Sequence, residues 1–134
     1  MRPERGSVIL ELALAASLLV ALLAGATQFG YAFWVYGQLQ NAVRNGARYA
    51  STRPYCAGRD REAVRNVVVY GVPEPAPGAA PVVRGLETGH VAVASKRREV
   101  TVTITDFSVD SVFSTYTFRG KPLAAAPVTG ECRP

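Results

Sequence analysis

Residues 8–26 read VILELALAASLLVALLAGA, and this stretch decides how the chain is organised. Glu11 is its only charged residue. A helix over these residues would rise about 28 Å, which is close to the hydrocarbon thickness of a bilayer. The stretch therefore predicts a membrane-spanning helix that carries one carboxylate near its N-terminal end.

The helical pattern continues well beyond the apolar stretch. Aromatic residues of the kind found at membrane–water interfaces come next: Phe29, Tyr31, Phe33, Trp34 and Tyr36. Apolar or small residues then recur every three or four positions, as on one face of an amphipathic helix: Val35, Leu39, Ala42, Val43, Gly46, Tyr49 and Ala50. No proline occurs between Pro3 and Pro54 to interrupt this pattern.

We therefore expect one helix over residues 7–51, about 65 Å long. Its membrane-spanning part and aromatic belt fall within 7–36, and its remaining turns are expected to pack against protein.

Composition limits what the rest of the chain can do. The 134 residues, 49% of them hydrophobic, suffice for one small domain. Fifteen Lys and Arg against ten Asp and Glu give a net charge of +5, which by itself would suit nucleic acid or anionic lipid. No aromatic–basic motif of nucleic-acid binding is present, and the basic run 96–98 is expected in a solvated turn. One His and two Cys exclude a His-rich or four-cysteine zinc site. We expect neither a nucleic-acid partner nor a cofactor.

Residues 52–134 predict a small α+β head that begins with a short helix. Asp60 is placed to cap a helix over 61–70, and Gly71 is placed to end it. The expected buried face consists of Ala63, Val64, Val67 and Val68. Because residues 67–69 are all β-branched, a strand remains the alternative.

A proline-rich connector and an antiparallel sheet are expected to follow. Four prolines in 73–81 predict a stiff connector without regular structure. Alternation of Val and Ile with smaller or Thr residues predicts a hairpin of 91–95 and 100–104, with its turn in 95–98. A third strand is expected near 116–118, and 123–128 is a further candidate.

Cys56 and Cys132 bracket nearly the whole head. In an oxidising compartment two such thiols are expected to pair. Closing a loop of roughly 75 residues would stabilise the head by about 4–5 kcal/mol on the chain-entropy account. Two unrelated thiols remain the alternative.

The sequence offers no catalytic constellation. His90 has no serine elbow or cysteine nucleophile pattern near it and is expected to be a capping or solvated residue. Asp106 and Asp110 are four residues apart and follow an expected strand, so their spacing in sequence does not fix their distance. We expect no enzyme activity.

Three processing fates are open to the N-terminus. Arg2, Arg5 and the run Ala24-Gly25-Ala26 satisfy the pattern of a secretory signal peptide cut after Ala26, although Glu11 interrupts its apolar region. An uncleaved single-pass anchor is the second. The third is cleavage after Gly6 by a prepilin peptidase, which leaves Ser7 as the first residue.

Glu11 distinguishes these fates. A carboxylate inside an apolar span is costly, by about 2.5–3.5 kcal/mol near the bilayer centre and less near an edge. It can either reach the interface or pair with a cation within the membrane. Cleavage after Gly6 would supply that cation, because the ammonium group of Ser7 on a neighbouring subunit could pair with Glu11 and remove both unpaired charges.

Small residues also form a stripe along the apolar helix at strict four-residue spacing. They are Ala13, Ser17, Ala21 and Gly25. Such stripes allow helices to approach closely in lipid, which makes this a candidate face for subunit packing. Small residues are also common in membrane helices generally, so the stripe alone does not decide the matter.

Residues 5–11, RGSVILE, resemble the processing site of type IV pilins: a basic leader, a Gly before the cut and a Glu five residues after it. Residues 6–51 are similar to the N-terminal region of TadE-like pseudopilins, the minor pilins of the tight adherence (Flp, type IVc) pilus. The aromatic stretch, QLQNA at 38–42 and NGARYA at 45–50 carry most of this likeness. Residues 63–71 and 100–104 are similar to the C-terminal part of the same family.

The resemblance implies a pilin-like α+β fold, in which a long N-terminal helix carries a head with a short helix and an antiparallel sheet. It implies a leader at 1–6, cut between Gly6 and Ser7, and a register role for Glu11 in assembly. The partners it implies are a prepilin peptidase, other pilin and pseudopilin subunits, an inner-membrane assembly platform and membrane lipid.

The expected location is the bacterial cell membrane, crossed once, with the N-terminus cytoplasmic and the head outside or incorporated in a pilus. Four arginines (Arg44, Arg48, Arg53 and Arg59) follow the span and only two precede it, a distribution that by itself favours the opposite orientation. The alternative function is a single-pass anchor that displays a periplasmic binding or adhesin domain. A small secreted hydrolase has almost no residue support.

Overall fold

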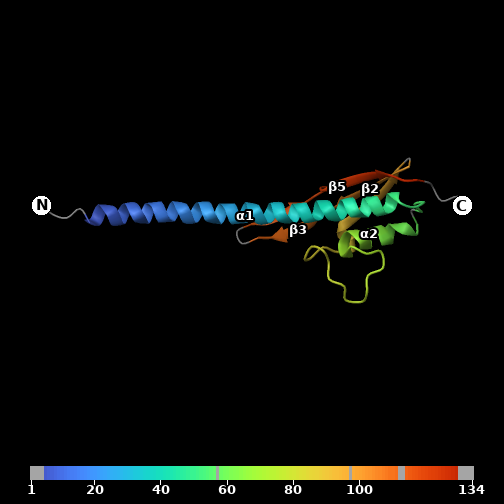
Figure 1. Ribbon diagram of the computed structural model, residues 1–134, viewed down its shortest axis with the longest axis horizontal. Coiled ribbons are helices and arrows are strands. Elements are labelled where there is room, and N and C mark those ends of the chain that lie inside the picture. The colour runs from blue at the N-terminus through green and yellow to red at the C-terminus, as the bar shows by residue number, and fades with distance from the viewer. Residues whose placement is uncertain (1–4, 57, 97, 112–113, 130–134) are drawn as a thin grey trace.

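A single helix, α1 (Arg5–Ser51), runs through 47 residues and forms the long axis of the molecule (Figure 1). The structure is a computed structural model that describes residues 5–56, 58–96, 98–111 and 114–129. The other elements pack along the C-terminal half of α1, whereas its N-terminal half projects alone. The predicted unbroken helix is confirmed, with its first residue at Arg5 instead of Ser7.

A shorter helix, α2 (Asp60–Tyr70), packs beside α1. Gly71 ends it as predicted: its φ of 78° is left-handed, and its N–H donates to the carbonyl of Val67 at 3.0 Å. The prediction that Asp60 is the N-cap is wrong, because Arg59 holds that position and Asp60 is the first helical residue. The Asp60 carboxylate instead accepts from the backbone N–H of Cys56 at 2.6 Å and so fixes the preceding turn.

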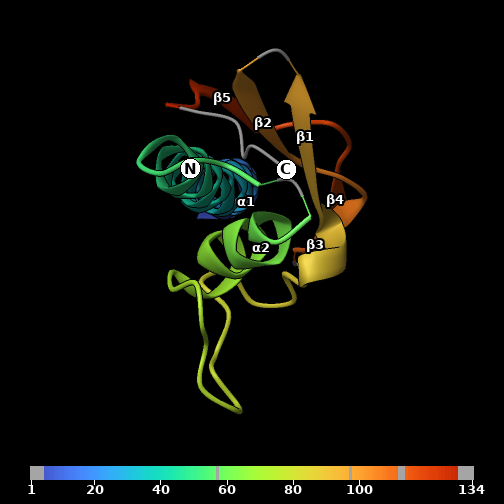
Figure 2. The same ribbon diagram turned by 90° about the vertical axis from the view of Figure 1, so that its right-hand side faces the viewer.

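The segment between α2 and the sheet contains the predicted proline-rich connector. Residues 71–87 form neither helix nor strand. Figure 2 shows this segment extending away from α1 as a long loop below α2. A three-residue 3-10 helix, η1 (Thr88–His90), then leads into the sheet.

The main sheet has three antiparallel strands in the order β1-β2-β5. β1 (Val91–Lys96) and β2 (Glu99–Ile104) form the predicted hairpin, with Val91 opposite Ile104 and Arg98 at a φ of 64° in the turn. β5 (Leu123–Pro127) pairs with the other edge of β2, so the candidate strand near 123–128 is confirmed.

A separate two-stranded hairpin comprises β3 (Phe107–Asp110) and β4 (Thr115–Phe118). The strand expected near 116–118 is β4, whereas β3 was not expected, because FSVD offers only two alternating apolar positions. Phe107 lies opposite Phe118 in this hairpin. The hairpin extends beside α1 toward its projecting half (Figure 1).

The core lies between the helices and one face of the main sheet. The end-on view shows α1 and α2 side by side under β2, β5 and β1 (Figure 2). Alternate residues of β2 (Val100, Val102 and Ile104) point into this core and are fully buried, whereas Thr101 and Thr103 on the other face are only half-buried. We call the part of the structure from residue 52 onward the head.

Gly46 sets how closely the two helices approach. A Cβ atom at this position would overlap the Cγ2 atom of Val68 and would lie 3.5 Å from the carbonyl oxygen of Val64. Val64 and Val68 are one turn apart on α2 and both are fully buried. Only glycine allows α2 to pack this tightly against α1.

Candidate membrane and assembly surface

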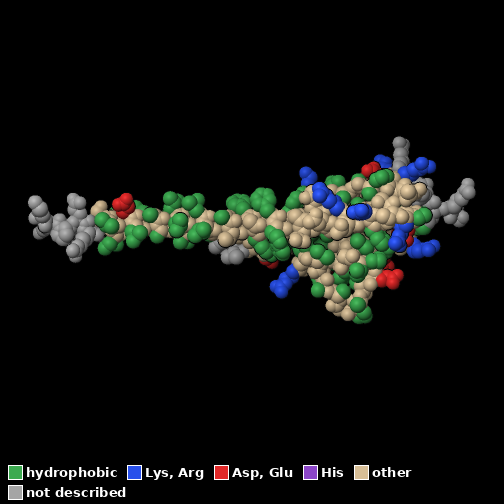
Figure 3. All heavy atoms as spheres, in the orientation of Figure 1, with side chains coloured by type: hydrophobic (Ala, Val, Ile, Leu, Met, Phe, Trp, Pro, Cys, Tyr) green, Lys and Arg blue, Asp and Glu red, His purple; other side chains and the backbone are tan. Residues whose placement is uncertain are grey.

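The projecting half of α1 is apolar on every side. Its large apolar side chains between Val8 and Leu23 are 57–69% exposed. Figure 3 shows hydrophobic side chains along this half, whereas the basic side chains gather over the head. By length and composition the helix can cross a membrane, and none of its most apolar window is buried. Exposed apolar area on this scale is stable in lipid and costly in water.

The hydroxyl side chains of Ser17 and Thr27 within this half hydrogen-bond to carbonyl groups of the helix backbone. The Ser17 hydroxyl donates to the carbonyl of Leu14 at 2.8 Å. The Thr27 hydroxyl is within hydrogen-bond distance of the carbonyls of Leu23 and Ala24, at 3.0 and 2.9 Å. These contacts remove the need for a partner in an apolar environment.

Glu11 is the exception. Its side chain is exposed and lies among Val8, Leu12 and Ala15. Within the part of the chain that the structure describes, no cation pairs with it. In a bilayer this carboxylate would therefore need a partner from outside the subunit or access to the interface.

The small-residue stripe and Glu11 lie on different sides of the helix. Two residues advance an α-helix by about 200°, so Glu11 is nearly opposite Ala13, the stripe residue at its own level. The stripe itself is open: Ala13, Ser17 and Ala21 are exposed, and a Cβ at Gly25 would meet nothing within 4 Å.

The predicted processing site lies at the start of α1. Gly6 and Ser7 are both helical, and Ser7 is exposed. Residues 1–4 of the predicted leader lie outside the described residues. Cleavage between Gly6 and Ser7 stays a prediction.

The head touches α1 well before the amphipathic turns begin. The side-chain amide of Gln28 accepts from the hydroxyl of Ser111 at 2.7 Å and donates to the hydroxyl of Ser114 at 2.8 Å. Both ends of the amide are thus bound by residues that flank the β3–β4 connection. The ring of Tyr36 lies 6.0 Å from that of Phe118 on β4.

Sequence reasoning missed this clamp, because the serine partners of Gln28 are 83 and 86 residues away. The available signal was the pair Ser111 and Ser114, which flank an apolar dipeptide in the sequence. Nothing in the sequence placed that pair at the level of Gln28.

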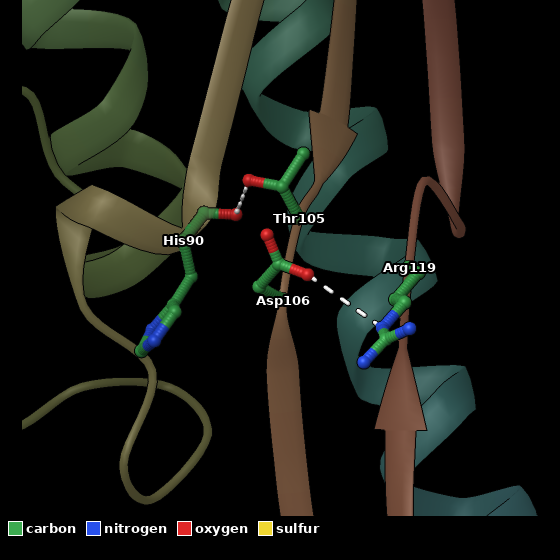
Figure 4. A network of polar contacts seen from close by, with 4 residues as sticks. All are labelled: His90, Thr105, Asp106 and Arg119. Carbon is green, nitrogen blue, oxygen red and sulfur yellow. Dashed lines mark hydrogen bonds and ion pairs between the residues drawn. The ribbon is translucent and has the colours of Figure 1, made fainter.

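The candidate chemical residues in the head have structural roles (Figure 4). The His90 ring nitrogen Nδ1 accepts from the backbone N–H of Glu87 at 3.2 Å, and its carbonyl accepts from the N–H of Thr105 at 2.8 Å. His90 is therefore a capping residue of η1, as expected. The Asp106 carboxylate lies 3.7 Å from the Arg119 guanidinium, with both side chains more than four-fifths exposed.

Asp106 and Asp110 do not form a carboxylate pair. They lie at opposite ends of β3, and Asp110 accepts from the hydroxyl of Thr115 at 2.7 Å. Among the described residues, no group of three or more His, Cys, Asp and Glu side chains could hold a metal ion.

Two further positions bear on the stability of the head. Tyr55 is buried, and its hydroxyl has no hydrogen-bond partner within the described ranges. Burial raises the pKa of Tyr55, and the nearby positive charge of Arg61 opposes part of that shift. Cys56 is half-buried, whereas Cys132 lies outside the described residues, so the disulfide stays a prediction.

Comparison with known proteins bears on the long helix. The family model described as TadE-like protein matches residues 6–48, which is nearly all of α1. No curated protein and no solved structure matches the chain. The match includes Glu11, the small-residue stripe and the turns that pack under the head. Over this helix, the chain is similar to the TadE-like protein family.

Proposed function

We propose that the protein is a structural subunit, a pseudopilin or minor pilin, of a tight adherence (type IVc) pilus. One observation carries this proposal: an exposed carboxylate on an otherwise apolar, fully exposed half-helix, within the region that matches the TadE-like family. A plain membrane anchor gains nothing from a charge at this place. An assembling subunit gains a fixed register.

In the proposed mechanism, the N-terminal half of α1 first holds the subunit in the bilayer. Polymerisation then replaces lipid contacts by contacts between helices. The stripe that contains Ser17 and Ala21 allows a neighbouring helix to approach, because small side chains maximise van der Waals contact where water exclusion cannot drive association. Glu11, on the other side at the level of Ala13, pairs with a cation of a second neighbour.

The cation would come from processing. A cut between Gly6 and Ser7 places an ammonium group four residues before Glu11 on each mature subunit. In each mature subunit, the ammonium group would lie about one helical turn before Glu11. A neighbouring subunit that is displaced along the helix axis would bring the ammonium of one subunit to the level of the carboxylate of the next. That displacement would set the axial step of the assembly.

Processing is tested by the intact mass and N-terminal sequence of the protein from its native host. We expect a first residue at Ser7. A first residue at Thr27 would exclude the pilin function and favour a secreted domain. An uncut Met1, in a host that processes its other prepilins, would favour the membrane-anchored binding or adhesin protein.

The role of the carboxylate is tested by Glu11→Ala and Glu11→Asp, with Glu74→Ala as the matched control. Glu74 is an exposed carboxylate in the connector, far from α1 in sequence. We expect Glu11→Ala to abolish incorporation into pili while membrane insertion persists, Glu11→Asp to retain part of it, and Glu74→Ala to have no effect. Normal incorporation of Glu11→Ala would contradict the register mechanism.

A further inference from the structure

A collar of aromatic residues surrounds α1 where the exposed span meets the head, and it contains two grooves. The first is lined by Phe29, Ala32, Phe33 and Tyr36 of α1 and by Tyr116 and Phe118 of β4. The second lies on the other side of the head contact and includes Tyr31, Trp34, Val82 and Arg84. We call these the hairpin groove and the arginine groove.

We propose that the collar is a phospholipid-binding surface, so that the head rests on the membrane instead of standing clear of it. Lipid chains of the leaflet at the C-terminal end of the span fill the hairpin groove. A lipid phosphate lies at Arg84 in the arginine groove. This inference requires that α1 spans a membrane, and it is independent of processing and of pilus assembly.

The height of the collar along α1 is the first argument. Phe29 lies about 4.5 Å and Phe33 about 10 Å beyond Ala26, the last residue of the apolar stretch, at 1.5 Å per residue. The interfacial layer of a bilayer is about 5–8 Å deep on each side of the hydrocarbon. The hairpin groove therefore begins within the layer that lipid headgroups and upper acyl chains occupy.

The Gln28 clamp is the second argument. It holds the β3–β4 hairpin against α1 only two residues beyond Ala26. The connection between β3 and β4 is thus fixed at the membrane boundary. β4 rises from it, so that Tyr116 lies nearer that boundary and Phe118 reaches the level of Tyr36. Because Ser111 and Ser114 satisfy both ends of the amide, Gln28 can lie in a partly apolar environment without an unpaired polar group.

The chemistry of the grooves favours lipid over a second subunit. Helices that pack in lipid meet through small residues, and the chain provides those in the separate stripe at Ala13, Ser17 and Ala21. The collar instead provides amphipathic rings, such as Tyr31, Trp34 and Tyr116, which suit a boundary that is apolar on one side and wet on the other. The cationic Arg84 matches the negative charge of phosphate.

Fluorescence quenching by lipids brominated on the acyl chain tests the proposal, because Trp34 is the only tryptophan of the sequence. In a Trp34→Phe background, the full chain is placed in vesicles of phosphatidylcholine and phosphatidylglycerol at high dilution. Phe118→Trp and Tyr116→Trp report on the head side of the hairpin groove. Leu18→Trp reports on the span, and Tyr49→Trp lies about 24 Å above Phe33 on the same helix.

We expect Tyr116→Trp to be quenched with an efficiency closer to that of Leu18→Trp than to that of Tyr49→Trp, and Phe118→Trp, which lies at the level of Tyr36, to be quenched less than Tyr116→Trp but more than Tyr49→Trp. Circular dichroism of each variant establishes that the head is folded, and two independent reporters guard against the loss of one. If Leu18→Trp is quenched but both head reporters behave like Tyr49→Trp, the head stands clear of the membrane and the proposal is wrong. The membrane span would remain established in that case.

Two further outcomes concern the occupant. The head reporters can be quenched by brominated lipid at high dilution and lose that quenching when subunits are crowded enough to cross-link. In that case lipid fills the groove in the free subunit, as proposed. If they are shielded even at high dilution while cross-linking shows dimers, a second copy is the occupant and the proposal is overturned. For the arginine groove, Arg84→Gln is expected to abolish the dependence of Trp34 emission on phosphatidylglycerol content, and persistence of that dependence would remove Arg84 from the site.

Discussion

The two halves of α1 are both rich in apolar residues, yet they suit opposite environments. In the C-terminal half, Val35, Leu39 and Val43 are buried on one side, and Arg44 and Arg48 are exposed. In the N-terminal half, large apolar residues surround the axis and remain exposed. What distinguishes the halves is the distribution of apolar residues around the helix. An apolar stripe packs against protein, whereas an apolar cylinder needs lipid.

Loss of the predicted disulfide should give the largest difference in effect between the head and the N-terminal half of α1. We expect the Cys56→Ser/Cys132→Ser double variant to lose up to about 4–5 kcal/mol of head stability, because a long loop in the unfolded chain is released. Denaturant unfolding of the full chain in detergent measures this, with near-ultraviolet circular dichroism for the head and far-ultraviolet helicity for α1. The parent protein under reducing conditions is the control and should match the double variant. Reaction of both thiols with alkylating reagent in the unreduced, unfolded parent would show that no bridge forms.

A matched pair of leucine truncations tests the comparison directly. Leu39 is fully buried and Leu18 is 63% exposed on the same helix. We expect Leu39→Ala to destabilise the head by about 2–5 kcal/mol, because it removes core contacts and leaves a cavity. Leu18→Ala should leave head stability unchanged and slightly weaken retention in membranes. Equal effects on head unfolding would mean that the N-terminal half also packs on the head.

A glycine pair measures the close approach of the two helices. At Gly46 an added methyl group would overlap Val68, whereas at Gly37 it would meet nothing within 4 Å. We expect Gly46→Ala to destabilise the head by about 1–3 kcal/mol through overpacking. Gly37→Ala should stabilise it by about 0.5–1 kcal/mol, because alanine favours the helix. The same assay applies, and stabilisation by both changes would contradict the tight contact.

The smallest effect is expected at Tyr55 and depends on pH. Its folded-state pKa is raised above the ordinary value of about 10. Below that value both states are protonated, so stability is complete. Above it the unfolded chain loses its proton first, and stability falls as pH rises toward the folded-state pKa.

We therefore expect Tyr55→Phe to reduce the alkaline loss of head stability and to change stability by less than about 1 kcal/mol at neutral pH, since the buried hydroxyl has no partner among the described residues. Unfolding curves from neutral to alkaline pH measure this. Tyr31→Phe, at an exposed position, is the control. An unchanged alkaline slope in Tyr55→Phe would remove Tyr55 as its source.

Local sequence signals sufficed wherever one residue type governs a backbone state. The absence of proline predicted the unbroken α1, Gly71 predicted the end of α2, and alternation predicted β1 and β2. The same reasoning failed at Asp60, because the helix begins one residue earlier than a capping residue requires and the carboxylate binds the Cys56 N–H instead. It also missed β3, whose four residues are too short for an alternating pattern to be recognised.

The candidate site also contains features that could be predicted from the sequence and features that could not. Glu11 and the stripe could be located from the sequence, since both follow from helical spacing alone. The Gln28 clamp and the hairpin groove could not, because they join α1 to residues more than 80 positions away. Their partners depend on how the β3–β4 hairpin is set against the helix.

By itself, then, the sequence determined a helix long and apolar enough to span a membrane, with one carboxylate near its start, continued as an amphipathic helix under a small α+β head. These features follow from composition and from the 3.6-residue period, which act over a few turns. Only the tertiary structure decided that α1 and α2 meet at Gly46, that β5 pairs with β2, and that the β3–β4 hairpin contacts α1 at Gln28. Those contacts join segments distant in the chain, and their geometry comes from how the helices and strands pack, which no local pattern encodes.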